Sequence, residues 1–171
     1  MRTSLLATFA VAGALAAAVV APAVSNAADT VVTFTVAGGA LNITAPANQT
    51  LTVTGNQATG GITPVVVSDQ RRGINGWTAS AVSTAFTKPA PDPASIPATA
   101  VTYQGSLPAV TGVAIVTPSL LPVVLDTTKS VQVATAVVGA NTATWTGNVT
   151  VTLPNDVVAG VYTGTITHSV A

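Results

Sequence analysis

From Thr30 onward, β-branched or apolar residues alternate with threonine, serine or asparagine. A two-residue period places the two sets of side chains on opposite faces of a β-strand. Threonine supplies the polar face here, and the β-branched residues suit a pleated, half-buried surface. No stretch has the period of an amphipathic helix. The clearest alternating segments are residues 33–36, 41–44, 50–54, 131–138, 148–153 and 161–170.

Glycine, proline and asparagine separate these segments at intervals typical of an all-β protein. We therefore predict an antiparallel β-sandwich with immunoglobulin-like layering and about eight or nine short strands. The expected turns lie at Gly38-Gly39, Gly60-Gly61, residues 73–76, Pro118, residues 154–156 and Gly160.

The proline-rich stretch of residues 88–100 is either a linker between two domains or a long loop inside one. A linker would leave about 60 residues of a mature chain before it and about 70 after it, sizes at which a core without disulfides or metals is marginal. We therefore predict a loop within a single domain.

The first 28 residues differ from the rest of the chain. Arg2 precedes an apolar run over residues 5–20, and Pro22 and small residues follow up to Ala27. This order is typical of a secretory signal peptide. The alternative is an uncleaved membrane anchor, since the apolar run approaches the roughly 20 residues that a bilayer requires.

Because alanine-rich helices insert weakly and Pro22 interrupts the run, we predict cleavage after Ala27 or one residue later. The expected organisation is a signal peptide over residues 1–27 and a single β-sandwich domain over residues 28–171. The protein is then secreted, with no membrane segment after cleavage.

Charge is scarce in this chain, which has five lysines and arginines and five aspartates, with no glutamate. Loss of Arg2 with the signal peptide leaves four cations against five aspartates, a net charge of −1. Such a chain lacks the basic surface that attracts nucleic acid or anionic lipid. It has no cysteine, so an exported form folds without disulfides.

Three segments carry a family resemblance. Residues 69–79, DQRRGINGWTA, resemble the first signature of the WxL domain of Gram-positive cell-surface proteins: an Asp, an Arg two residues on, a glycine-rich turn, then Gly-Trp opening a strand. Residues 141–154 resemble the penultimate strand of that domain, and residues 159–170 its closing segment. Ala79 replaces the Leu of the first W-x-L, and His168 and Val170 replace the Trp and Leu of the second.

The resemblance implies an exported protein held non-covalently on the cell wall through peptidoglycan. The positions that carry the motif, and that we expect to be structural, are Asp69, Arg71, Gly76, Trp145 and Tyr162.

Asp69, Arg71 and Arg72 crowd together just before Trp77 in a chain with few charges. In a structural interpretation, Asp69 accepts hydrogen bonds from turn amides and from Arg71, and so fixes the loop that leads into the Trp77 strand. In a functional one, an arginine presents its planar guanidinium to a carboxylate or phosphate of a wall polymer. We favour the structural role for Asp69 and Arg71, and Arg72 is the ligand candidate.

Both tryptophans have two interpretations, as core residues or as platforms for a sugar ring. Residues 79, 81 and 83 share the face of Trp77 and are small, which suits an indole packed flat across a sheet. We favour core packing for Trp77 and for Trp145, because a core with so few aromatics needs its large side chains.

His168 is the single histidine and shares a strand face with Tyr162, Ile166 and Val170. A lone histidine on such a face is usually packed and hydrogen-bonded. We also hypothesise that Trp77 and His168 form one aromatic-imidazole patch. The candidate ligand-binding residues are Arg72, Trp77 and His168.

Enzyme chemistry finds little support in the sequence. One histidine, no cysteine and no glutamate supply neither a catalytic triad nor a transition-metal shell. A calcium loop near Asp126 or Asp156 lacks the ligand spacing of an EF-hand. We expect no catalysis, no cofactor and no bound metal.

Two functions remain in view. The first is a secreted, non-catalytic, cell-wall-associated module that binds peptidoglycan or another wall polymer non-covalently. The alternative is a self-assembling or partner-binding structural subunit, because uncharged strands lack the lysines that discourage edge-to-edge pairing. Its partner would be another copy or another exported β protein, and the final strand is one segment it could donate.

Overall fold

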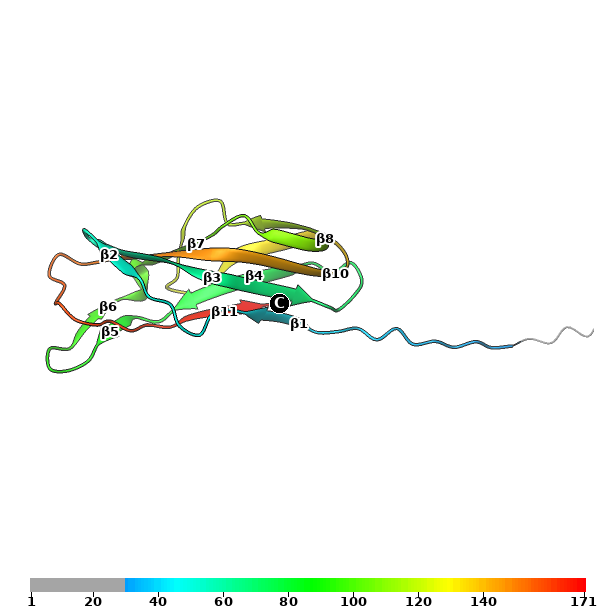
Figure 1. Ribbon diagram of the computed structural model, residues 1–171, viewed down its shortest axis with the longest axis horizontal. Coiled ribbons are helices and arrows are strands. Elements are labelled where there is room, and N and C mark those ends of the chain that lie inside the picture. Colours follow the sequence, from blue (N-terminus) through cyan, green and yellow to red (C-terminus); the bar gives the residue numbers. More distant parts are fainter. Residues whose placement is uncertain (1–29) are drawn as a thin grey trace, which may run out of the picture. The chain divides into compact units, whose positions relative to one another are not determined.

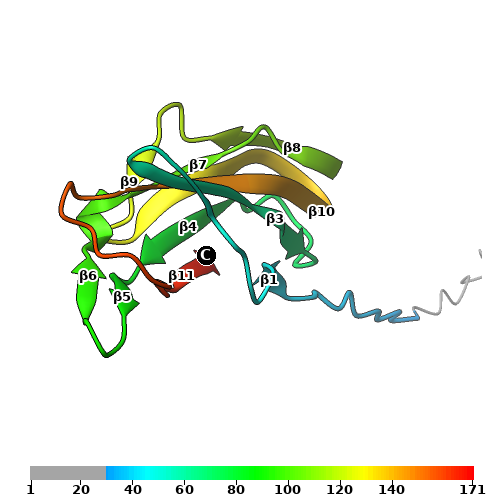
Figure 2. The ribbon, with the colours of Figure 1, turned by 60° about the vertical axis from the view of Figure 1, so that its left-hand side comes forward.

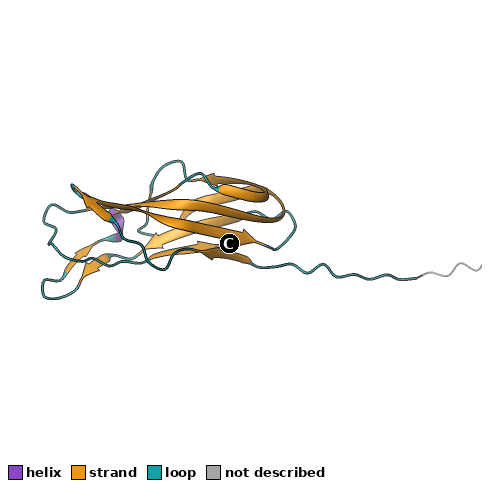
Figure 3. Ribbon diagram, viewed as in Figure 1, coloured by secondary structure: helices purple, strands orange, loops and turns teal. Residues whose placement is uncertain are grey.

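The computed structural model describes residues 30–171. The expected signal peptide, residues 1–27, lies outside the described residues. The chain divides into two units, Met1–Thr35 and Val36–Ala171. In the first unit, residues 30–35 have no regular secondary structure. The second, which we call the folded unit, is all-β apart from a single-turn 3₁₀ helix, η1 (Ala98–Ala100) (Figure 3).

Eleven strands form a nine-stranded antiparallel sheet and a separate two-stranded hairpin, β5–β6 (Figure 1). No helix among residues 30–171 is long and apolar enough to cross a membrane. The strands are β1 (Leu41–Thr44), β2 (Thr52–Thr54), β3 (Gln57–Asp69), β4 (Trp77–Ser83), β5 (Phe86–Lys88), β6 (Ala94–Ile96), β7 (Val101–Gly105), β8 (Ala109–Pro118), β9 (Val123–Val124), β10 (Lys129–Thr152) and β11 (Ile166–Val170).

The 24-residue strand β10 organises the folded unit. Its first part pairs with β4 and with the end of β8, whereas its last part pairs with β3 and β7. Register shifts and positive φ angles at Ala136 (50°) and Gly139 (72°) let the strand bend between these parts. The expected β-sandwich class is confirmed, in a form where one strand serves both layers (Figure 2).

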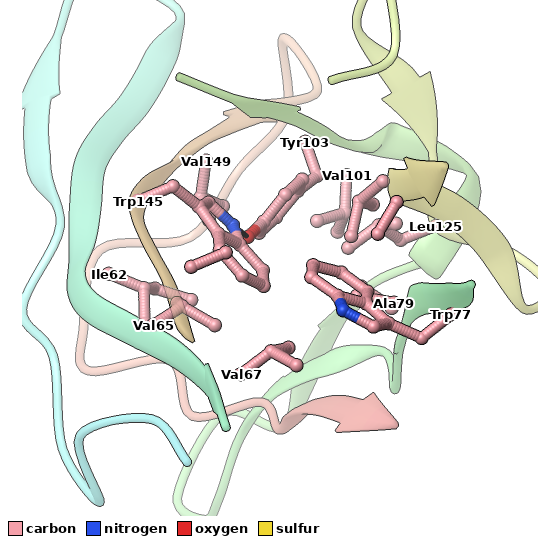
Figure 4. Close-up of a cluster of buried hydrophobic side chains, with 14 of the residues drawn as sticks. Ile62, Val65, Val67, Trp77, Ala79, Val101, Tyr103, Leu125, Trp145 and Val149 are labelled. Atoms are coloured by element: carbon pink, nitrogen blue, oxygen red, sulfur yellow. Dashed lines mark hydrogen bonds between the residues drawn. The ribbon is translucent and has the colours of Figure 1, made fainter. Parts of the chain in front are cut away.

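The outer strands complete each layer. β11 pairs with β4, β1 and β2 pair with β3, and β9 pairs with β7. The core lies between the layers and is built from alternate residues of the central strands, as the two-residue period predicts. Every second residue of β4, from Trp77 to Ser83, is buried, and those between are half-buried. Figure 4 shows Trp77, Trp145 and Tyr103 among the valines of this core.

One expected strand and one expected turn differ from the structure. Residues 33–36 form no strand, and Phe34 is 83% exposed. Their alternation defines an apolar face, but a strand also needs a hydrogen-bonded neighbour. Gly60-Gly61 lies inside β3 instead of in a turn. A Cβ at Gly60 would stand 2.8 Å from Leu51 Cδ2, so here glycine permits close packing.

The expected loop of residues 88–100 contains more structure than the sequence indicated. It includes the end of β5, all of β6 and η1, and it remains within the folded unit. Three-residue strands are too short for their alternation to stand out. Ile96, 2% exposed, anchors this hairpin in the core.

The prediction of two separate strands over residues 131–138 and 148–153 is wrong. A single strand, β10, spans nearly all of both segments. Gly139 and Ala140 have no register partner, yet the strand continues past them, because pairing with β8 resumes and pairing with β3 begins at Asn141.

Candidate functional site

The loop between β3 and β4 is held by a clamp made of Asp69 and Arg71. Asp69 ends β3 and is 2% exposed. Its Oδ1 accepts hydrogen bonds from the Arg71 backbone N and from Arg71 Nε, and its Oδ2 accepts one from Arg71 Nη2, all at 3.0 Å. Arg71 Nη2 also donates to the Gly76 carbonyl oxygen at 3.0 Å. The hydrogen bonds that the structural interpretation expects between Asp69 and Arg71 are present.

The electrostatics of the clamp favour both charged forms. The hydrogen bond from Arg71 holds the pKa of Asp69 below its ordinary value of 3.8, against the opposing effect of burial. The same bond raises the pKa of Arg71. Charge-assisted, bidentate pairs of this kind fix geometry as well as contributing energy. The loop therefore enters β4 in one defined conformation.

Gly76 is fixed by close packing at the end of this loop. A Cβ there would clash with the Ala134 carbonyl oxygen of β10. In addition, the Gly139 backbone N–H donates a hydrogen bond to the Gly73 carbonyl oxygen at 2.8 Å. The motif position Gly76 thus allows β4 to begin directly against β10.

Arg72 lies at the exposed tip of the clamped loop. Its φ of 61° is left-handed, an unusual conformation for a residue with a side chain, and Gly73 follows with φ 101°. Its side chain makes no hydrogen bond or ion pair with any residue from 30 to 171. The neighbouring Ile74 is 79% exposed. The loop tip thus exposes both a cationic residue, Arg72, and an apolar one, Ile74.

Trp77 lies in the core and is 2% exposed. Its Nε1 donates to Asn141 Oδ1 of β10 at 3.1 Å. Asn141 lies directly opposite Asp69 in the β3–β10 pairing, so this contact adjoins the clamp. Burial leaves the indole no open face for a sugar ring. Core packing, the interpretation that the sequence favoured, is what the structure shows.

Trp145, Tyr103 and His168 form a hydrogen-bonded row between the layers, which we call the aromatic row. Trp145 Nε1 donates to Tyr103 Oη at 3.0 Å (Figure 4), and Tyr103 Oη lies 3.2 Å from His168 Nε2. The Tyr103 and His168 rings meet edge to face, with centroids 5.5 Å apart. Among residues 30–171, His168 thus pairs with Tyr103, and the hypothesised ring pair with Trp77 does not occur.

Burial shifts the titration of two members of the aromatic row. It raises the pKa of Tyr103 to about 12, although the hydrogen bond from Trp145 opposes this shift. It lowers the pKa of His168 below its ordinary value of 6.5. At neutral pH the phenol therefore keeps its proton and the imidazole is uncharged, so Tyr103 Oη can donate to His168 Nε2 while accepting from Trp145.

Sequence reasoning missed Tyr103 and Asn141, the partners of the two indoles. Residues 101–105 do alternate, and Val101 and Tyr103 are both fully buried, so a weak signal was present. Asn141 is 3% exposed in a strand of polar and small residues, and its role depends on which strand lies opposite.

An apolar groove opens on another part of the folded unit. It has a volume of about 540 Å³, and the residues from 157 to 164 form one of its sides. Tyr162 lies in this segment, and its Oη donates to the Val158 carbonyl oxygen at 2.9 Å. The other apolar lining residues include Leu51, Val53, Phe86, Ile96, Val151 and Leu153.

Metal ligands do not gather in the described part of the chain. No group of three or more histidine, cysteine, aspartate or glutamate side chains converges within residues 30–171. Asp126, considered for calcium, instead pairs with Lys129 at 3.3 Å on the surface.

These contacts define an all-β, sandwich-like domain whose motif residues order a loop and fill a core. Comparisons of the chain with protein-family models, with curated proteins and with solved structures found no match.

Proposed function

We propose that the chain is an exported, non-catalytic module of the cell surface. Its β3–β4 loop binds a wall polymer, and peptidoglycan is the polymer we favour. The observation that carries this proposal is Arg72, an exposed guanidinium at the tip of a loop that the Asp69–Arg71 clamp makes rigid. The resemblance of residues 69–79 to the first WxL signature supports the same loop.

The chemistry of the site suits a carboxylate. A guanidinium presents planar, paired donors that match the carboxylates of a wall peptide, and also the phosphates of other wall polymers. Because the clamp already orders the loop, little conformational freedom is lost on binding. A single exposed contact is weak, and many copies along one polymer raise the overall affinity.

Trp77 and His168 support the proposal only indirectly. Trp77 is buried directly after the loop, and His168 is half-buried against Tyr103. Their proposed part is to keep β4 and β11 in place beneath the binding surface.

Co-sedimentation with purified peptidoglycan, at low and high salt, tests the proposal. The wild-type chain is expected to sediment at low salt and to be released at high salt, since exposed charge contacts are screened. Arg72→Ala should abolish binding, and Arg72→Lys should restore it only in part. Lys88→Ala is the matched control, because it removes one cation whose Nζ already donates to the Asp92 carbonyl oxygen. A folded wild-type chain that stays in the supernatant at low salt contradicts wall binding.

A further inference from the structure

β8 is an edge strand with an unprotected stretch. Among the described strands it pairs only with β10. Between Gly112, at φ 82°, and Pro118 it reads VAIVT, residues 113–117, without charge, glycine or proline. Natural edge strands are commonly protected by such residues, because their free N–H and C=O groups are a template for another strand. Residues 113–117 offer that template.

The same stretch carries exposed apolar side chains. Val113 is 57% exposed and Ile115 is 62% exposed. Val138 of β10 lies directly opposite Val113 and is 59% exposed. We call these three residues the β8 strip. Leu120 and Leu121 follow β8 and are 87% and 74% exposed. A group of exposed apolar side chains of this kind is typical of an interaction site.

Residues 32–36, VTFTV, which we call the arm, form a second segment that lacks a strand partner. They carry the alternation of a strand but belong to none. Val32, Phe34 and Val36 share one parity and are 79%, 83% and 62% exposed. Thr33 and Thr35 share the other. β-branched and aromatic residues strongly favour extended, paired backbone.

We propose that the arm of one copy adds as a strand to residues 113–117 of β8 in a second copy, so that the chain assembles with itself head to tail. Both segments are five residues long and uncharged. Backbone hydrogen bonds would supply affinity, as in other cases of strand addition. The apolar face of the arm would extend the β8 strip through cross-strand pairs and leave the threonines on the opposite face.

The form of the assembly follows from this pairing. Each copy has one arm and one β8 edge, and the two are different surfaces. Such a contact is heterologous, so it leaves a free arm at one end and a free edge at the other. It therefore grows into a filament, or into a ring if the rotation between copies closes. The inference does not depend on wall binding, because Arg72 has no part in it.

Engineered disulfides test the contact directly, because the chain has no cysteine. Chains with Phe34→Cys and chains with Ile115→Cys are purified separately, mixed and oxidised. The expected product is a disulfide-linked dimer containing one chain of each kind. Val53→Cys replaces Ile115→Cys in the control, since Val53 is also 62% exposed, lies in the edge strand β2 and lines the apolar groove.

Two outcomes of this experiment would overturn the proposal. The first is linkage of Phe34→Cys to Val53→Cys at least as efficient as to Ile115→Cys, which would place the arm in the groove. The second is a chain carrying both Phe34→Cys and Ile115→Cys that closes a disulfide on itself and stays monomeric.

Sedimentation velocity measures the association itself. Phe34→Asp and Ile115→Lys should each weaken self-association by at least about tenfold, or about 1.4 kcal/mol. Val53→Lys should leave it unchanged. A mixture of the Phe34→Asp and Ile115→Lys chains should recover association, because the new charges attract across the strand pair. Unaltered thermal unfolding verifies that each variant is folded. A wild-type chain that remains monomeric at every concentration overturns the proposal.

Discussion

The aromatic row shows how individual side chains satisfy their polar groups in a core that is otherwise aliphatic. Tyr103 is fully buried, and its hydroxyl serves both Trp145 and His168. A buried donor or acceptor left without a partner costs about 1–3 kcal/mol. The Tyr103 hydroxyl therefore gives a partner to Trp145 Nε1 and, as long as His168 is uncharged, to His168 Nε2.

This dependence predicts an effect of pH on stability. The pKa of His168 is lowered in the folded chain from 6.5, so the unfolded chain takes up its proton first as the pH falls. The free energy of unfolding should be level above about pH 6.5 and decline below it. Denaturant unfolding at a series of pH values measures this decline, and His168→Gln should remove it.

The Asp69 carboxylate supplies an internal comparison in the same experiment. Its pKa is lowered from 3.8, so the stability it contributes is present above that pH and is lost as the pH falls further. His168→Gln should leave this second decline in place. If the decline just below pH 6.5 is the same in wild type and variant, the role assigned to His168 is wrong.

At the scale of elements, β10 joins the two layers, and its small residues set how closely other strands approach. Gly147 lies opposite Gly105 in the β7–β10 pairing, and a Cβ on Gly147 would clash with the phenol ring of Tyr103, also in β7. The ring thus occupies the space that a side chain on β10 would fill. The aromatic row and the β7–β10 pairing consequently depend on the same glycine.

Gly147→Ala should lower the free energy of unfolding by about 1–3 kcal/mol, the usual cost of overpacking a core. The neighbouring residue provides the control, because Asn148 is exposed, and Asn148→Ala should change stability by no more than about 0.5 kcal/mol. Urea unfolding of both variants measures the difference. Equal stabilities would mean that the Tyr103 ring is not confined by β10.

At the scale of the whole molecule, the two ends of the described chain are held differently. The folded unit begins at Val36, and the side chains of residues 30–35 are exposed. At the other end of the chain, β11 pairs along its length with β4 and contributes His168 to the aromatic row. The two ends of the described chain should therefore differ in their importance for folding.

A chain that starts at Val36 should unfold within about 0.5 kcal/mol of a chain that starts at Thr30, since it loses only the exposed residues 30–35. Removal of residues 166–171 should instead destabilise the fold strongly, because β4 would lose one of its two ladder partners and Tyr103 would lose its histidine. Thermal and urea unfolding of the two shortened chains test this contrast. A large loss of stability in the first chain would contradict it.

The sequence by itself determined the class of the fold and the roles of several residues. Alternation identified several of the strands and, in β4, the buried face, because the two-residue period is a local property of the backbone. The Asp69–Arg71 clamp could be predicted for a similar reason, since its partners lie two residues apart. The burial of Trp77 and Trp145 followed from the scarcity of other large side chains.

Only the tertiary structure decided which strands pair and where. The continuity of β10, the place of Gly60-Gly61 inside β3, and the choice of Tyr103 as partner of His168 each depend on residues far apart in sequence. Residues 33–36 show the difference most clearly, because they have the pattern of a strand and no described partner. Alternation defines the two faces of a strand, whereas its hydrogen-bonding edges are satisfied only by a neighbour that the local sequence does not specify.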